Sequence, residues 1–365
     1  MDVISFFSDF ALGSESSHDL LSYLYTLPSV YKPLYFRQML IFSTNDINKT
    51  VREACFRNQI EIISSNEKTY TFVLSREYGQ KKYVKGTICF LPSESEGFYY
   101  LFSVSDSAFW NYLVRYLIRN TYPRIKSIFY KQNEIIKVLN YLVEKNNLNM
   151  KFRVKEVTTK EKRGKIYKFD TERRWTDLSV DQLFSQGSER NQLFISIVLK
   201  VYIARIGVEK LVESNEIKVY KNGEIFTRNL DENLVKDLNK RLEVDVRNRF
   251  NLYKDRGLRN AKKIMPKPLE VTFDSEVFSN IDEFNRFRNL IKKYPNSNKT
   301  IIHSNPYFYL TISDFIDGSS FDLWVVESNK ISLVPQSKSS QQGFEKLIKY
   351  IFENFKEGTI KEMEI

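Results

Sequence analysis

Three apolar runs decide the fold prediction: YTFVLS (70–75), YVKGTICFLP (83–92) and GFYYLFSV (97–104). They are rich in Val, Ile, Tyr and Phe, and turn residues separate them, which is the pattern of antiparallel strands joined by short loops. In the next run, AFWNYLVRYLIRN (108–120), apolar side chains recur at helical spacing, and Ser105 or Asp106 can cap the first turn. This stretch predicts a strand meander followed by an amphipathic helix.

The carboxy-terminal part repeats this pattern. A helix predicted at 281–294 is followed by strand-like runs at 300–304, 307–315, 320–327 and 330–335 and by a second amphipathic helix at 341–355. Two explanations are open. The chain contains an internal duplication, or it uses a common α+β arrangement twice, which the slight identity between the two parts favours.

The central part is also predicted to be rich in strands. It contains MKFRVKEVTT (150–159), a long apolar run at 192–205, and IKVYKNGEIFTR (217–228) with the hairpin signal Asn222-Gly223. A long helix is predicted at 232–254. We therefore predict an α+β protein with antiparallel meanders, each followed by amphipathic helices, in two or three abutting domains: 1–148, 149–268 and 269–365.

The net charge of +11 is unevenly distributed along the chain. Segment 246–268, VRNRFNLYKDRGLRNAKKIMPKP, contains eight Lys and Arg residues and a single acid, Asp255. Segments 111–131 and 151–174 are also basic, so the remainder of the chain has net negative charge. Such segregation favours binding of a polyanion, although three separate solvated faces would give the same pattern.

We predict nucleic acid as the partner, bound through its phosphate backbone, because no helix-turn-helix or zinc finger is recognisable. Binding of this kind requires no cofactor. The predicted contacts are Arg115, Arg119, Lys151, Arg153, Lys155, Lys162, Arg163, Arg247, Arg249, Lys254, Arg256, Arg259, Lys262 and Lys263. Reversing the charge of Arg247, Arg249, Arg256 and Lys263 is expected to abolish binding without unfolding the chain.

An aromatic strand is a second candidate for nucleic-acid contact. The run Gly97-Phe98-Tyr99-Tyr100-Leu101 resembles the aromatic strand of RNA-recognition folds, in which exposed rings stack on bases. Glu96 stands where that pattern has a basic residue. Aromatic residues at alternate positions of a strand also fill hydrophobic cores, and this alternative predicts buried rings.

A short polar motif near the carboxy terminus suggests an enzyme as the alternative. Asp322 on one predicted strand and Gln336-Ser337-Lys338 after the next resemble the PD-(D/E)xK nuclease core in its Q-x-K form. The resemblance implies Mg²⁺ held by Asp322 and Gln336, with Lys338 near the attacked phosphate. Further acids considered for this site are Glu276, Glu283 and Glu327. An ordinary hairpin followed by a helix capped at Ser339 or Ser340 explains the same residues.

Other features exclude several classes of protein. The chain has no P-loop, no G-x-S-x-G and no run of apolar residues long enough to span a bilayer. The first residues include no basic n-region, and Cys55 and Cys89 form no disulfide framework, so we expect a cytoplasmic protein. A scaffold subunit is a third alternative. An accessory role in a prokaryotic defence or mobile-element complex is an expectation that no motif supports.

Overall fold

The computed structural model confirms an α+β fold with antiparallel sheets. The chain divides into two compact units, Met1–Glu243 and Val244–Ile365. The structure describes residues 3–30, 35–79, 82–144, 150–161, 166–170, 192–203, 212–228, 232–254, 256, 267–304, 307–336 and 339–363.

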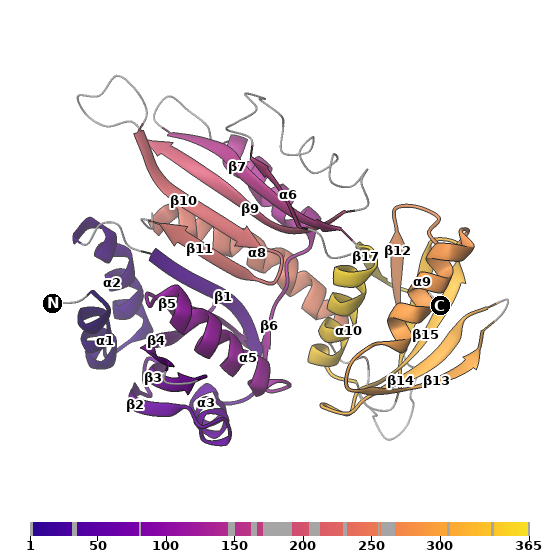
Figure 1. The fold of residues 1–365 in the computed structure, drawn as a ribbon, viewed down its shortest axis with the longest axis horizontal. Coiled ribbons are helices and arrows are strands. Elements are labelled where there is room, and N and C mark those ends of the chain that lie inside the picture. The colour runs from indigo at the N-terminus through magenta and orange to yellow at the C-terminus, as the bar shows by residue number, and fades with distance from the viewer. Residues whose placement is uncertain are drawn as a thin grey trace. The chain divides into compact units, whose positions relative to one another are not determined.

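The first unit is built on a sheet with strand order β2-β3-β4-β5-β1-β11-β10-β9-β7-β8, and β6 also pairs with β1 (Figure 1). Its helical elements are α1 (Val3–Gly13), α2 (Ser17–Val30), α3 (Ile47–Arg57), α4 (Ser107–Phe109), the π-helical turn η1 (Trp110–Val114), α5 (Arg115–Thr121), α6 (Gln132–Glu144) and the beginning of α8 (Glu232–Tyr253). Its strands are β1 (Tyr35–Ser43), β2 (Glu61–Asn66), β3 (Thr71–Tyr78), β4 (Lys82–Pro92), β5 (Phe98–Ser103), β6 (Ile125–Ser127), β7 (Met150–Glu161), β8 (Ile166–Asp170), β9 (Gln192–Ile203), β10 (Val212–Tyr220) and β11 (Glu224–Arg228).

Alternate side chains of β4 and its neighbours enter two different cores. Ile88 and Phe90 pack with α3, η1 and α5 on one face of the sheet. Cys89 and Leu91 face the other way, where α1, α2 and Val235 of α8 cover them. Both faces of this part of the sheet are therefore buried, which explains why its strands are apolar on both sides.

The second unit contains the end of α8 and a sheet with strand order β13-β14-β15-β16-β12-β17. Its further elements are β12 (Leu269–Phe273), α9 (Ile281–Lys292), β13 (Ser297–His303), β14 (Tyr309–Asp314), β15 (Ser320–Glu327), β16 (Lys330–Pro335), α10 (Gln341–Asn354) and β17 (Gly358–Glu362). On β14 the buried Leu310 and Ile312 alternate with half-buried polar and aromatic side chains. The described helices pack on the buried side, where Phe344 of α10 meets Phe321 of β15.

The two units share one strand topology. In the first unit β1, α3, four strands β2–β5, helix α5 and β6 follow in order, and in the second unit β12, α9, four strands β13–β16, α10 and β17 do the same. Ile41 of β1 pairs with both Tyr99 and Ser127, so β5 and β6 lie on opposite edges of β1. Val271 of β12 likewise lies between β16 and β17. The repeated meander predicted from sequence therefore corresponds to the same strand order in both units.

The domain boundary predicted at residue 148 differs from the structure. Strand β1 pairs with β11 from Tyr35↔Arg228 to Met39↔Glu224, so residues assigned to separate domains belong to one continuous sheet. The predicted boundary at residue 268 differs too, because the division between the compact units falls within α8. Pairing between distant strands leaves no signal in local periodicity, which explains both differences.

Candidate nucleic-acid interface

Arg249 is buried and does not face solvent, contrary to its predicted contact with phosphate. Its Nε and Nη2 donate to the two carboxylate oxygens of Glu345 on α10, each at 3.2 Å. The exposed fraction is 3% for the Arg249 side chain and 0% for that of Glu345. A two-point contact of this kind neutralises both charges and joins the end of α8 to α10.

Arg256 is also buried, with 2% of its side chain exposed, and it binds several groups at once. Its Nη1 donates to the carbonyl oxygens of Lys267 at 3.0 Å and Pro268 at 3.4 Å, and its Nε donates to that of Leu252. Its Nη2 forms an ion pair with Glu362. Desolvation lowers the pKa of Arg256, and Glu362 acts against that shift. Arg256 therefore ties the end of α8 to the beginning of β12.

Three cations around this anchor are exposed: Arg247, Lys254 and Lys267. Arg247 and Lys254 are seven residues apart, and the exposed Asn251 lies between them. The helical repeat therefore places Arg247, Asn251 and Lys254 on one side of the end of α8. Within the described ranges, no carboxylate forms an ion pair with Arg247, Lys254 or Lys267. Cations at the carboxyl end of a helix also interact favourably with the helix dipole. This interaction is a structural reason for part of the positive charge near the end of α8.

The predicted cations of the first unit have several acidic partners. Arg115 donates to both oxygens of Glu224, through Nε at 2.6 Å and through Nη2. This contact, above all the hydrogen bond to Glu224, raises the pKa of Arg115. Lys155 lies 3.5 Å from Glu216. Arg119 is exposed, 5.6 Å from the centre of the Tyr116 ring.

The contacts predicted on strand 150–159 are partly neutralised, because Lys155 pairs with Glu216. Glu156 lies 3.9 Å from both Lys168 and Lys218, and β7 has a register shift between Val154 and Glu156. The structure does not describe the side chains of Lys151 and Arg153. The other predicted contacts outside the described residues are Lys162, Arg163, Arg259, Lys262 and Lys263.

Asp322 of the predicted nuclease motif lies on β15, with 8% of its surface exposed. It accepts hydrogen bonds from Thr311 Oγ1 at 2.6 Å, from Tyr309 OH at 3.1 Å and from the Gln336 amide. The structure therefore brings Asp322 and Gln336 into contact, and hydroxyl and amide donors occupy the carboxylate. Lys338 lies outside the described residues.

The further acids proposed for this motif lie elsewhere. Glu283 pairs with Arg286 at 3.0 Å on α9, and α9 packs on the sheet face opposite Asp322. Glu327 pairs with Lys330 at 3.1 Å, while Glu276 accepts from Ser279. Among the residues that the structure describes, no three His, Cys, Asp or Glu side chains are grouped closely enough to hold a metal ion. Each of these three acids has its own partner in the described structure: Arg286, Lys330 or Ser279.

The aromatic strand β5 is covered in the first unit. Phe98 is buried against Phe42, and the Tyr100 hydroxyl donates to Glu243 on α8. Desolvation is the main reason that the pKa of Tyr99 is raised. The hypothesis that these aromatic residues fill a hydrophobic core therefore describes β5 better than the hypothesis that they stack on bases.

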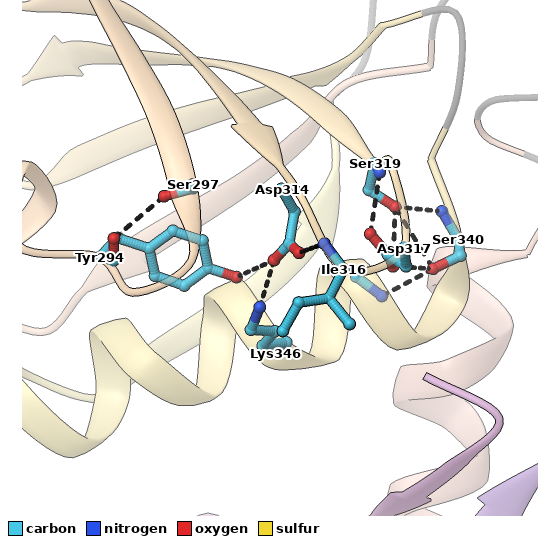
Figure 2. Close-up of polar contacts among 9 residues, drawn as sticks. Tyr294, Ser297, Asp314, Ile316, Asp317, Ser319, Ser340 and Lys346 are labelled. Carbon is cyan, nitrogen blue, oxygen red and sulfur yellow. Dashed lines mark hydrogen bonds and ion pairs between the residues drawn. The ribbon is translucent and has the colours of Figure 1, made fainter. Parts of the chain in front are cut away.

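A second polar cluster fixes the turn after β14 to α10. Figure 2 shows the Asp314 carboxylate between the Tyr294 hydroxyl, at 3.3 Å, and the Lys346 ammonium group. In the same turn, Asp317 accepts from Ser319 Oγ at 3.0 Å and from Ser340 Oγ at 2.6 Å, and Ser340 caps α10. These contacts stay within the protein, so we assign the cluster a structural role.

Sequence reasoning missed three residues that the structure makes prominent. Lys267 lies inside the basic segment but is not among the predicted contacts, and the sequence predicts Tyr309 and Trp324 only as strand residues. The alternation of apolar and polar residues in 309–314 and 320–325 was the available signal, because it places both rings on the polar face.

Comparison with known proteins adds no family assignment. None of the helices in the described part of the chain has the length and apolar character needed to cross a bilayer. No protein-family model matches the chain, and no curated protein matches its sequence.

Proposed function

We propose that the chain is a nucleic-acid-binding protein that contacts the phosphate backbone through Arg247, Lys254 and Lys267. The observation that supports this best is the anchoring of Lys267 by Arg256, whose guanidinium binds the carbonyls of Leu252 and Lys267. Residues 13 positions apart in the chain, Lys254 and Lys267, are thereby held near one buried group while both side chains face solvent.

Arg115, Arg249 and Arg256 are not part of the proposed surface, because they are engaged by Glu224, Glu345 and Glu362. Arg119 is exposed and remains a predicted contact in the first unit. Binding through phosphate needs no metal and no particular base sequence, so we expect weak sequence preference and strong dependence on salt. A cytoplasmic location is part of the same proposal, and a protein partner stays a prediction.

Fluorescence anisotropy with a labelled oligonucleotide tests the proposal. The triple variant Arg247→Glu, Lys254→Glu, Lys267→Glu should bind at least about tenfold more weakly than the unmodified chain. In a plot of the logarithm of the binding constant against the logarithm of the salt concentration, the slope of this variant should be shallower by about three. Each lost phosphate contact accounts for about one.

The matched control is the triple variant Lys49→Glu, Lys85→Glu, Lys293→Glu, which changes the net charge equally at exposed positions elsewhere. It should retain most of the affinity. Equal losses in both variants would show that total charge, and not this surface, determines binding. Absence of binding by the unmodified chain at low salt would overturn the proposal.

A further inference from the structure

One face of the second sheet carries two stacked aromatic rings and faces away from α9 and α10. Tyr309 and Trp324 are directly paired on β14 and β15, with ring centres 4.1 Å apart and planes 22° apart. Trp324 is 43% exposed. We call this side of the sheet, with Tyr309, Thr311, Asp322, Trp324 and Ser332, the open face. Its exposed side chain is Trp324, Tyr309 and Thr311 are half-buried, and Asp322 and Ser332 are buried.

A hydrogen bond at its hydroxyl group fixes the orientation of the Tyr309 ring. Its hydroxyl donates to Asp322, and Asp322 is itself fixed by Thr311 and Gln336. A ring with a fixed orientation loses little conformational freedom when a flat ligand stacks on it. The motif that resembled a nuclease core thus positions an aromatic side chain.

The corresponding face of the first unit is covered. There, α1, α2 and α8 pack over Phe36, Leu91 and Phe102. The two units have the same strand order, yet in the second unit Trp324 on this face remains exposed. The open face therefore differs from its counterpart by presenting the Trp324 ring to solvent.

Cations border the open face on the side of β12 and β17. The register places Lys361 opposite Glu270, Glu270 opposite Ser332, and Ser332 opposite Trp324. Lys361 is therefore three strands from Trp324, or about 14 Å at the usual strand spacing. Lys267 immediately precedes Pro268 and β12 and is exposed.

The acids beside this border are already paired. Glu270 and Glu327 lie 3.8 Å and 3.1 Å from Lys330, and Glu362 binds Arg256. Exposed cations at this edge of the sheet complement a strand whose phosphates lie at that edge and whose bases extend across the open face to the rings.

We propose that the open face binds single-stranded nucleic acid by stacking bases on Trp324 and Tyr309, while Lys267 and Lys361 contact its phosphates. This inference rests on the proposed function and adds strandedness and a second element of the site to it. In a duplex the bases are already stacked on each other, so these rings are not available partners for them.

Anisotropy titrations with a labelled oligothymidine of about 20 nucleotides and with a duplex of equal length test this inference. Trp324→Ala should weaken binding of the single strand about 5- to 150-fold, the range found for loss of one stacked base. Binding of the duplex should change less than about twofold, because it depends on phosphate contacts. Trp324→Phe, which keeps a ring, should restore much of the single-strand affinity.

Phe56→Ala is the matched control, since Phe56 is an exposed aromatic residue on α3 of the first unit and not on the open face. It should leave both affinities unchanged. If Trp324→Ala binds the single strand as well as the unmodified chain does, the stacking inference is wrong even though phosphate binding stands. If the unmodified chain binds neither probe, the proposed function and this inference both fail.

Discussion

Arg249 and Glu345 form a fully buried ion pair in which two N–H groups of the guanidinium meet the two oxygens of one carboxylate, both at 3.2 Å. The two residues are 96 positions apart and come from α8 and α10. An arginine in the most basic segment of the chain thus serves the core of the second unit. Its charge cannot be added to a surface that attracts phosphate.

Arg249→Met should lower the free energy of unfolding by about 3–5 kcal/mol, because it leaves the Glu345 carboxylate buried without a cation. Urea denaturation followed by circular dichroism measures this. The double variant Arg249→Met, Glu345→Leu should recover most of the loss, since it removes both buried charges. A double variant as unstable as the single one would show that the pair matters for its shape and not for its charge.

Arg256→Met should lower the free energy of unfolding by about 1–3 kcal/mol, because the carbonyls of Leu252, Lys267 and Pro268 lose their hydrogen-bond donor. Glu362→Gln should cost less than about 1 kcal/mol, as the Glu362 side chain is 61% exposed and its ion pair is accessible to solvent. The comparison by urea denaturation separates the backbone contacts of Arg256 from its ion pair. Equal effects would contradict the anchoring role.

Both cysteines should be inert in the folded chain. Burial raises the pKa of the Cys55 and Cys89 thiols to about 12, from an ordinary value of 9.0. At about pH 8, a colorimetric disulfide reagent should label them slowly before unfolding and quickly in denaturant. Because the folded state holds these protons more tightly, this contribution to stability is complete below about pH 9 and is lost as the pH rises toward 12.

Rapid labelling of either thiol in the folded chain at about pH 8 would contradict the burial of that cysteine. The control for the pH dependence is the variant Cys55→Ala, Cys89→Ala. Its stability should fall less than that of the unmodified chain between about pH 9 and pH 12.

Gly343→Ala should destabilise the second unit by about 1–3 kcal/mol. An added Cβ would lie 2.5 Å from Ser319 Oγ and 2.8 Å from Asp317 Oδ2, inside the cluster that caps α10. Gly13→Ala is the control, because no atom lies within 4 Å of its added Cβ and alanine favours the end of α1. Thermal unfolding of the two variants should therefore shift in opposite directions, and unchanged melting of Gly343→Ala would show that the turn yields to the new methyl group.

Asp322→Ala distinguishes a positioning residue from a nuclease carboxylate. We expect it to weaken single-strand binding, because Tyr309 loses the acceptor that orients it, and to leave any cleavage of DNA or RNA in Mg²⁺ unchanged. Tyr309→Phe keeps the ring but loses the same hydrogen bond, so it should weaken single-strand binding to a similar extent. Cleavage by the unmodified chain that disappears in Asp322→Ala would support the nuclease alternative instead.

Local sequence patterns predicted most elements of the fold. The helix predicted at 341–355 is α10 (Gln341–Asn354), and the strands predicted at 320–327 and 330–335 are β15 and β16. Apolar spacing and capping residues are properties of neighbours in the chain, so they are readable without a structure. Patterns along the chain did not predict the strands β1, β2, β6, β8, β12 and β17. The short strand β12, for example, pairs with β16 on one side and with β17 on the other.

The sequence by itself determined the α+β class, the repeated meander and the presence of a strongly basic segment. Only the tertiary structure decided which cations in that segment face solvent, because the partners of Arg249 and Arg256 come from α10 and β17, far along the chain. It also decided that Tyr309 lies beside Trp324, since strand register is set by packing across the whole sheet and not by the residues of one strand.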